Sequence, residues 1–446
     1  MKGLKLLTIY PGYCLQSLSK GFSTSSVKLQ RHYKLLIVGA GAGGCAVANK
    51  FTSKLGAEEV GVIEPNEVHH YQPLWTLVGG GIKHVADCSQ LTSKVLPRKC
   101  EWIREAAAGF NPDKCIVTLS SGEEIKYEYL VVATGLQLRF DKIKGLPAGF
   151  AKDPTLCSNY DYAYVQKTWP AIKNFKGGNA FFTIPNSSIK CIGAAQKIMY
   201  LAEETWRTKG LQDKTSVNMW TALKVIFGVK KYANTLHKII KKRNIKVKYR
   251  MNLIEVKTDT REAVFENLES PTQETTTVKY DFLHITPPMT TPDAVKDSCL
   301  ADSNGYVDID KGTLQHVRYP NIFGLGDCTN APTSKTAAAA ATQSGILQRN
   351  LTALMLGKPL KAIYDGYTSC PLITARGKCI LAEFNYDALP LETFPFDQGK
   401  ERRSMYIVKK DILPIVYWRM MVNGLWNGPK FWRKIMHLGF DGPEKE

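Results

Sequence analysis

The cysteine at position 191 stands in the segment SIKCIGAAQKI, where its surroundings could support redox chemistry. A helix is predicted directly after it, over residues 193–210. The positive end of that helix and the neighbouring cation of Lys190 would both lower the pKa of the Cys191 thiol. A thiolate placed in this way can act as a nucleophile or as an electron donor. The alternative is a buried structural thiol, which is the commoner fate of a lone cysteine.

A site for a dinucleotide is predicted near the N-terminus, in the segment YKLLIVGAGAGGCAVANKF. An apolar strand leads into a glycine-rich turn and then a helix, whose N-terminus offers free N–H groups to a pyrophosphate. Glu64 ends the following strand and is placed to accept hydrogen bonds from ribose hydroxyls. The residues predicted to form the phosphate-binding turn are Gly39, Gly41, Ala42, Gly43 and Gly44.

Two further segments indicate that the dinucleotide is FAD. YEYLVVATG, residues 127–135, and NIFGLGDCTNAPTSKTAAAAA resemble the paired signatures of flavoproteins that have two dinucleotide-binding domains. The resemblance implies that Asp327 binds a ribityl hydroxyl and that the alanine-rich helix points its N-terminus at the flavin. That dipole and Lys335 would stabilise the negative charge of a reduced flavin, unless Lys335 is simply an exposed lysine of the first helical turn. The further candidate contacts in these segments are Thr134, Gly135 and Gly326.

The second half of the chain repeats the strand–turn–helix pattern without the glycines. GGNAFFTIP is predicted to be a strand, but the turn after it reads PNSSIKCIG. The side chains of Ile189, Lys190 and Ile192 would obstruct a pyrophosphate, and no acidic residue ends the next strand. NAD(H) is therefore not expected to bind in the usual way. A redox thiol at Cys191 could replace hydride as the electron donor to the flavin.

The chain is strongly basic, with 59 lysines and arginines against 40 aspartates and glutamates among 446 residues. This balance suits an anionic membrane better than nucleic acid, because the charges form no single dense tract and no nucleic-acid motif is present. Residues 1–32 contain no acid and many serines, which predicts a mitochondrial presequence rather than a merely basic tail. No apolar stretch is long enough to span a membrane.

The C-terminal residues 404–440 mix aromatic rings with lysines and arginines. This composition is too charged to span a bilayer and favours two helices that lie in the membrane interface. An ordinary packing helix or a dimer contact would explain it less well. A route for a quinone near Phe384 and Phe396 is a further hypothesis.

Several longer segments resemble the sulfide:quinone oxidoreductases of mitochondria. They include EPNEVHHYQPLWTLVGGG, KCIGAAQKIMYL, YDGYTSCPL and LETFPFDQGKERRSMY, and the likeness extends over residues 33–440. The resemblance implies that Cys191 and Cys370 form a redox pair as a disulfide or trisulfide. Sulfide would attack it to give a persulfide and a thiolate, the flavin would pass two electrons to ubiquinone, and glutathione or sulfite would accept the sulfur.

The resemblance also extends the set of candidate residues. Gln72 and Ala107 are expected near FAD, whereas His69 and His70 point apart on an extended segment and are not expected to bind a metal. Cys379 is a competing partner for Cys191. The cysteines interpreted as structural are Cys45, Cys88, Cys100, Cys115, Cys157, Cys299 and Cys328.

The expected fold class is α/β, with two Rossmann-like dinucleotide-binding domains, of which only the first binds a nucleotide. The first should comprise residues 33–150 and 301–360, and the second, which carries Cys191, residues 151–300. Residues 361–446 should hold the second redox cysteine and the surface that contacts the inner mitochondrial membrane. Two alternatives remain, a type II NADH:quinone dehydrogenase and a flavin-binding scaffold without redox activity.

Overall fold

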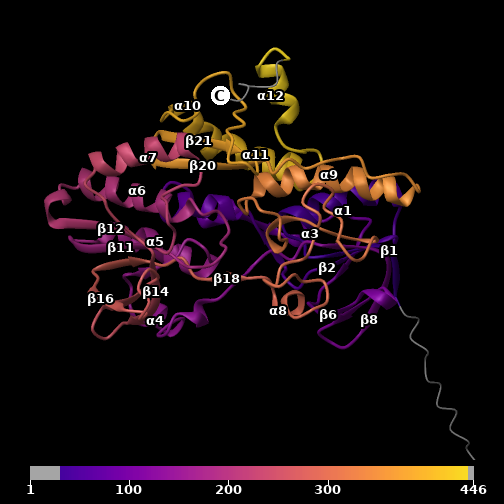
Figure 1. The fold of residues 1–446 in the computed structure, drawn as a ribbon, viewed down its shortest axis with the longest axis horizontal. Coiled ribbons are helices and arrows are strands. Elements are labelled where there is room, and N and C mark those ends of the chain that lie inside the picture. The colour runs from indigo at the N-terminus through magenta and orange to yellow at the C-terminus, as the bar shows by residue number, and fades with distance from the viewer. Residues whose placement is uncertain (1–30, 440–446) are drawn as a thin grey trace, which may run out of the picture.

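The computed structural model describes residues 31–439, which form two sheets side by side with a C-terminal region above them (Figure 1). The first sheet has the order β5-β2-β1-β8-β7-β6, and β19 pairs with β8. Its central strands are parallel, and β2 together with the last residues of β1 and β8 is apolar and buried, as expected where a sheet is covered on both faces. Its strands are β1 (His32–Val38), β2 (Val60–Ile63), β5 (Glu101–Ile103), β6 (Ala107–Asn111), β7 (Ile116–Leu119), β8 (Glu124–Val132) and β19 (Ile322–Gly324).

Two long helices pack on each other against the first sheet, α1 (Ala42–Leu55) and α9 (Ala337–Met355). Each begins close to the end of a parallel strand, where a doubly wound fold binds its ligand. The shorter elements of this half are β3 (Val68–His70), α2 (Trp75–Gly79), β4 (Ser89–Leu91) and α3 (Thr92–Val95).

The second sheet is parallel, with the order β10-β17-β11-β12-β13. Its strands are β10 (Leu156–Cys157), β11 (Gly178–Ile184), β12 (Thr215–Thr221), β13 (Lys246–Tyr249) and β17 (Phe282–His284). Its helices are α5 (Tyr162–Asn174), α6 (Ala194–Thr208) and α7 (Lys230–Lys242). A three-stranded antiparallel sheet is added by β14 (Met251–Lys257), β15 (Glu262–Asn267) and β16 (Thr275–Lys279). The connecting elements are β9 (Gln137–Leu138), α4 (Ala148–Lys152), β18 (Met289–Thr290) and α8 (Asp293–Lys296).

The C-terminal region starts with the antiparallel pair β20 (Thr368–Ala375) and β21 (Lys378–Phe384), and β20 packs on α6. A helical run follows, in which α10 (Arg403–Ile407) and α11 (Leu413–Val416) alternate with two π-helical turns, Val408–Ile412 and Tyr417–Met421. The last helix is α12 (Lys430–Met436). The C-terminal region thereby contacts both sheet domains, through α6 and α9.

The expected α/β class with two Rossmann-like sheets is confirmed. The strands and helices predicted around both turns are present within a few residues of the expected bounds. Residues 1–30 of the expected presequence lie outside the described residues, and β1 already begins at His32. Within residues 31–439, no helix has the length and apolarity needed to cross a membrane.

Candidate active site

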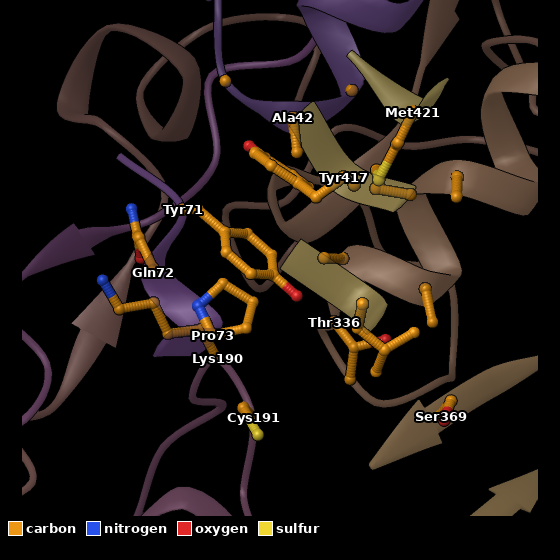
Figure 2. Close-up of a pocket in the computed structure, with 18 of the residues that line it drawn as sticks. Ala42, Tyr71, Gln72, Pro73, Lys190, Cys191, Thr336, Ser369, Tyr417 and Met421 are labelled. Atoms are coloured by element: carbon orange, nitrogen blue, oxygen red, sulfur yellow. The ribbon is translucent and has the colours of Figure 1, made fainter. Parts of the chain in front are cut away.

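A cavity of about 1040 Å³ lies where the two sheets and the C-terminal region meet. Its walls come from the glycine turn before α1, the N-terminus of α9, the turn before α6 and the C-terminal helical run. Figure 2 shows Cys191 and Lys190 on one wall and Tyr417 and Met421 on the opposite side, with Tyr71 between them. The predicted site residues on its walls are Gly39, Gly41, Ala42, Gly43, Glu64, Gln72, Thr134, Gly135, Cys191, Gly326, Asp327 and Lys335.

The glycine turn leaves the N-terminus of α1 open to this cavity. At Gly41, a Cβ atom would meet nothing within 4 Å, so a ligand can approach the backbone there. Gly39 has a positive φ of 101°, which the tight turn requires. A Cβ on Gly44 would lie 1.8 Å from the Gly39 carbonyl oxygen, so only glycine lets α1 pack this closely on β1. These are the three distinct properties of a phosphate-binding turn.

Glu64 is held at the edge of the cavity by the backbone around it. Its Oε2 accepts a hydrogen bond of 2.8 Å from the Ala40 N–H, and its Oε1 accepts one of 2.8 Å from the Asn66 N–H. The carboxylate is therefore fixed beside the glycine turn. In a dinucleotide-binding fold, an acid at this position accepts hydrogen bonds from the ribose that is attached to the pyrophosphate.

The other end of the cavity carries Asp327 and Lys335. Lys335 Nζ donates to the carbonyl oxygens of Asp327 at 2.7 Å and of Thr329 at 3.0 Å. Burial raises the pKa of Asp327, against the opposing charge of Lys335, and burial lowers the pKa of Lys335. Lys335 is therefore not an exposed lysine of the first helical turn. It lines the cavity and is hydrogen-bonded to the loop that begins with Asp327.

The two predicted redox cysteines lie together, with their Sγ atoms 3.8 Å apart. Cys191 lines the cavity, whereas Cys370, in β20, is 2 % exposed and lies behind it. The hydrogen bond from Cys370 and the charge of Lys197 hold the pKa of Cys191 well below its usual value despite burial. The same hydrogen bond and burial raise the pKa of Cys370. The site therefore favours ionisation of Cys191 over that of Cys370.

The cation at this pair is Lys197 rather than Lys190. Lys197, in the first turn of α6, reaches back so that its Nζ lies 3.2 Å from Cys191 Sγ. Burial alone would lower the pKa of Lys197, but the two thiols raise it. The side chain of Lys190 turns the other way, with Nζ 5.3 Å from the centre of the Trp75 ring. The expectation that Lys190 stabilises the thiolate is thus wrong, because Cys191 has a positive φ of 47° in the turn and the Lys190 side chain lies over Trp75.

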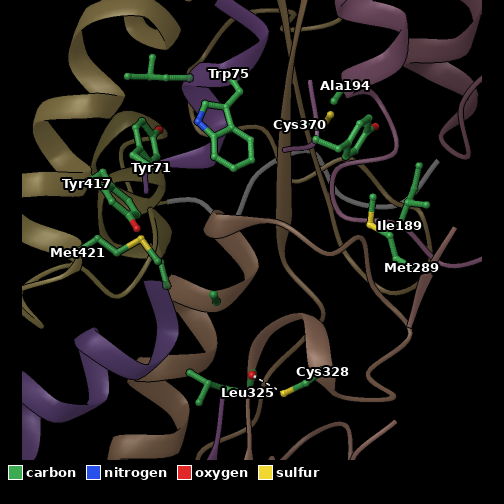
Figure 3. Close-up of a cluster of buried hydrophobic side chains, with 14 of the residues drawn as sticks. Tyr71, Trp75, Ile189, Ala194, Met289, Leu325, Cys328, Cys370, Tyr417 and Met421 are labelled. Carbon is green, nitrogen blue, oxygen red and sulfur yellow. Dashed lines mark hydrogen bonds between the residues drawn. The ribbon is translucent and has the colours of Figure 1, made fainter. Parts of the chain in front are cut away.

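The N-terminus of α6 is covered by β20. Figure 3 shows Cys370 beside Ala194, the first residue of α6. A Cβ on Gly193 would lie 2.7 Å from both Cys370 Sγ and Leu372 Cδ2. Side chains of β20 therefore fill the space that a pyrophosphate occupies in a nucleotide-binding turn.

Cys379 does not compete with Cys370 in this structure. Its side chain is fully buried and donates to the carbonyl oxygen of Ile380, and burial raises the pKa of the thiol to about 12. Cys328 is buried as well, with Sγ 3.4 Å from the Leu325 carbonyl oxygen (Figure 3). All ten described cysteines are free thiols.

His69 and His70 have different partners, and no group of metal-binding side chains occurs among the described residues. His70 Nδ1 lies 2.7 Å from Ser89 Oγ. His69 Nδ1 lies 2.9 Å from the Ala40 carbonyl oxygen and Nε2 lies 2.6 Å from the Tyr417 hydroxyl. Burial lowers the pKa of His69 to about 4, so the neutral ring donates to Ala40 and accepts from Tyr417.

Tyr417 belongs to the segment 404–440 that is expected at a membrane interface, but it is buried and lines the cavity instead. Its ring stacks on Tyr71 at 4.1 Å, and its hydroxyl connects the C-terminal run to the glycine turn through His69. Phe384 and Phe396, proposed above to lie near a quinone route, do not line the cavity. Phe394, from the same loop as Phe396, does. Gly44 and Ala107 are not among the lining residues.

Two Rossmann-like sheets, one open glycine turn and a cysteine pair at the shared cavity define a flavin-dependent disulfide oxidoreductase. The profile of that class, pyridine nucleotide-disulphide oxidoreductase, matches residues 33–345. The chain is 53 % identical to the mitochondrial sulfide:quinone oxidoreductase of Mus musculus over 413 residues, which are 92 % of this chain and 91 % of the relative. It is 45 % identical to that of Dictyostelium discoideum, over 90 % and 88 % of the two chains.

The chain therefore belongs to the sulfide:quinone oxidoreductase family, and its cofactor is FAD. The crystal structure of the enzyme from Aquifex aeolicus has the same fold, with a TM-score of 0.73 at 19 % identity over 93 % of this chain and 96 % of that one.

The cavity fits FAD by its own chemistry. Gly41 leaves room at a helix N-terminus for a pyrophosphate, and Glu64 is oriented for a ribose. Trp75 also lines the cavity, and its buried Nε1 has no hydrogen-bond partner within residues 31–439. A buried donor without a partner in such a wall indicates a ligand that accepts its hydrogen bond.

Proposed function

We propose that this protein oxidises hydrogen sulfide through the Cys191–Cys370 pair, passes two electrons to ubiquinone by way of FAD, and transfers the sulfur to a small nucleophile such as glutathione or sulfite. The observation that carries the proposal is the position of the pair. One thiol lines the cavity that fits FAD, and its partner lies 3.8 Å behind it.

The oxidised pair is the target of sulfide. Hydrosulfide attacks Cys370 Sγ, the bond between Cys370 and Cys191 breaks, and both electrons of that bond remain on Cys191 as a thiolate. The products are a persulfide on Cys370 and a thiolate on Cys191. Exchange is faster when the leaving thiol has the lower pKa, and the ammonium group of Lys197 at 3.2 Å supports Cys191 in this role. In a trisulfide, attack on Cys370 Sγ would give the same persulfide on Cys370 and release Cys191 as a persulfide anion instead of a thiolate.

Removal of the outer sulfur completes the cycle. A glutathione thiolate or sulfite attacks the outer sulfur of the persulfide, and Cys370 leaves as a thiolate. Re-formation of the bond between the two cysteines then releases two electrons, and FAD, when bound, supplies their acceptor and delivers them to the quinone. Cys191 lines the cavity, so the electrons released at the pair have a direct path to the site that fits FAD.

We place the quinone in the part of the cavity that the C-terminal region lines. That wall is apolar, with Phe394, Met420, Trp426 and Met436 among its residues. Next to it, Leu425, Phe431 and Trp432 are 69 %, 68 % and 45 % exposed, which suits a protein that rests on a membrane surface without crossing it. Together with the mitochondrial names of the relatives, this supports a location at the inner mitochondrial membrane.

The test is an anaerobic titration of the purified FAD-loaded protein with sulfide, followed by flavin absorbance. We expect bleaching in the wild type and a rate lower by about a thousandfold or more in Cys191→Ser and in Cys370→Ser, the scale for loss of a nucleophile. Cys379→Ser, which replaces a buried thiol of the same hairpin, is the matched control and should behave as wild type. Bleaching by NADH, with no response to sulfide, would refute the proposal and favour a quinone dehydrogenase.

A further inference from the structure

Positive charge is concentrated in one part of the second sheet domain. Residues 214–254 contain nine lysines, two arginines and neither aspartate nor glutamate. The expectation of charge without a dense tract therefore does not hold here. Helix α7 lies in the middle of this run and supplies five of the lysines.

The outer face of α7 carries five lysines, together with Asn234 and His237. The helix buries Tyr232, Leu236 and Ile239 and turns its lysines to solvent. Lys231 is paired with Glu392 and Asp397. Within residues 31–439, no ion pair includes the other four, which are Lys230, Lys238, Lys241 and Lys242. Like charges so close together repel one another, so a face of this kind is stabilised by an anionic partner.

One residue joins this face to the exposed apolar surface of α12. Glu392 Oε1 accepts a salt bridge of 2.8 Å from Lys231, and the carbonyl oxygen of the same residue lies 3.2 Å from His437 Nε2, just after α12. Tyr232 also donates to Glu392. Both helices lie in the upper half of Figure 1, whereas α4 and β8 lie at the bottom. The first turn of α7 is thus linked through Glu392 to the end of α12, on which Phe431, Trp432 and Ile435 are exposed.

We infer that α7 is an electrostatic contact for anionic lipid, which extends the membrane surface of the C-terminal region onto the second sheet domain. Exposed apolar and aromatic side chains beside a row of lysines are the combination that an interfacial protein presents to charged headgroups. An acidic protein would fit the lysines but would leave the adjoining apolar side chains of α12 unexplained. This inference rests on the proposed membrane location.

The test compares binding of the FAD-loaded protein to vesicles of phosphatidylcholine with cardiolipin and to vesicles of phosphatidylcholine alone. The triple variant Lys238→Gln, Lys241→Gln, Lys242→Gln should lose about a hundredfold in partitioning to the anionic vesicles, at about fivefold per lysine near the surface. Its binding to neutral vesicles and its rate with a water-soluble quinone should equal those of the wild type. The difference should shrink as salt is raised.

A charge-matched control separates this contact from net charge. Lys114→Gln, Lys126→Gln, Lys152→Gln removes three exposed lysines from the region of β7, β8 and α4, and it should bind anionic vesicles almost as wild type does. If both triple variants lost the same fraction of their binding to anionic vesicles, or if the α7 variant lost none, this inference would be overturned. The proposed membrane location would still stand. Wild-type protein that binds neither kind of vesicle would overturn the proposed membrane location and this inference with it, while leaving sulfide-driven bleaching unaffected.

Discussion

The turns before α1 and α6 begin with the same unit, a buried parallel strand followed by a helix, and serve opposite purposes. At Gly41, the space in front of the helix is open to the cavity. At Gly193, the equivalent space holds Cys370 and Leu372 of β20. The first helix end fits a pyrophosphate, and the second lies beside a thiolate. The difference comes from what packs on the turn, since both helices present the same positive end of a dipole.

The comparison shows how a nucleotide-binding unit can be converted to thiol chemistry. A helix N-terminus that no longer needs to admit a phosphate can be covered by a strand from elsewhere in the chain. Here β20 brings its cysteine across 179 positions of sequence, to 3.8 Å from Cys191. Because no phosphate has to approach this turn, glycines are not required there. Bulky residues such as Ile189 and Ile192 can occupy their positions.

The largest effect is expected from closing the open turn. Gly41→Val would place a side chain where the structure leaves free space and should displace the pyrophosphate from α1. Loss of two hydrogen bonds to a charged phosphate amounts to about 3 kcal/mol, or about a hundredfold in FAD affinity. Fluorescence titration of the apoprotein with FAD measures it. Gly228→Val is the control, because Gly228 also has nothing within 4 Å of its Cβ position; an equal loss there would contradict the argument.

A smaller effect is expected from disturbing the covered turn. Gly193→Ala adds a methyl group 2.7 Å from Cys370 Sγ, at a φ of −76° that alanine tolerates. The strand must then move away from α6, and a displacement of about 1 Å at reacting atoms lowers a rate by up to about a hundredfold. We expect sulfide-driven bleaching to slow by between about tenfold and a hundredfold, while FAD affinity stays unchanged.

Stopped-flow absorbance with sulfide measures that rate, and FAD titration of the same variant serves as its internal control. Loss of FAD from Gly193→Ala, or a rate equal to that of wild type, would show that the two turns are not as independent as the structure indicates.

The same comparison explains what could be predicted from the sequence. The turn before α1 can be predicted from its own sequence, because its glycines stand at fixed spacing: Gly44 packs on the Gly39 carbonyl, and Gly41 faces open space. The site at α6 depends on contacts between distant segments. Pairing of Cys191 with Cys370 was available only from resemblance to a family, and Tyr417, which reaches His69 across 348 positions, had no signal.

Lys197 lies between these two cases. It is only six positions from Cys191, but Cys191 lies in the turn with a positive φ of 47° while Lys197 lies in the helix. A residue in the first turn of a helix lies near the N-terminus of that helix. The lysine of the AAQK stretch is therefore a signal in the sequence for a cation close to Cys191. Lys190 is adjacent to Cys191 in the sequence, but its side chain lies over Trp75 and not beside the thiol.

The smallest predicted effect concerns this lysine. In Lys197→Gln the thiolate of Cys191 loses its nearest cation, so the pKa of the thiol should rise towards its ordinary value. The thiolate then persists only at higher pH. Loss of a hydrogen bond to a charged group slows alkylation of reduced Cys191 by iodoacetamide at neutral pH by about tenfold. Mass spectrometry of the Cys191 peptide over a range of pH follows the midpoint.

Lys409→Gln provides a graded comparison. Lys409 is equally buried and acts on Cys191 through its charge, but its Nζ donates to the Pro73 carbonyl oxygen at 3.0 Å and not to the thiol. Its replacement should move the midpoint in the same direction by less than Lys197→Gln does. An unchanged midpoint in Lys197→Gln would mean that the hydrogen bond from Cys370 alone keeps Cys191 ionised, and the turn before α6 would then need no cation of its own.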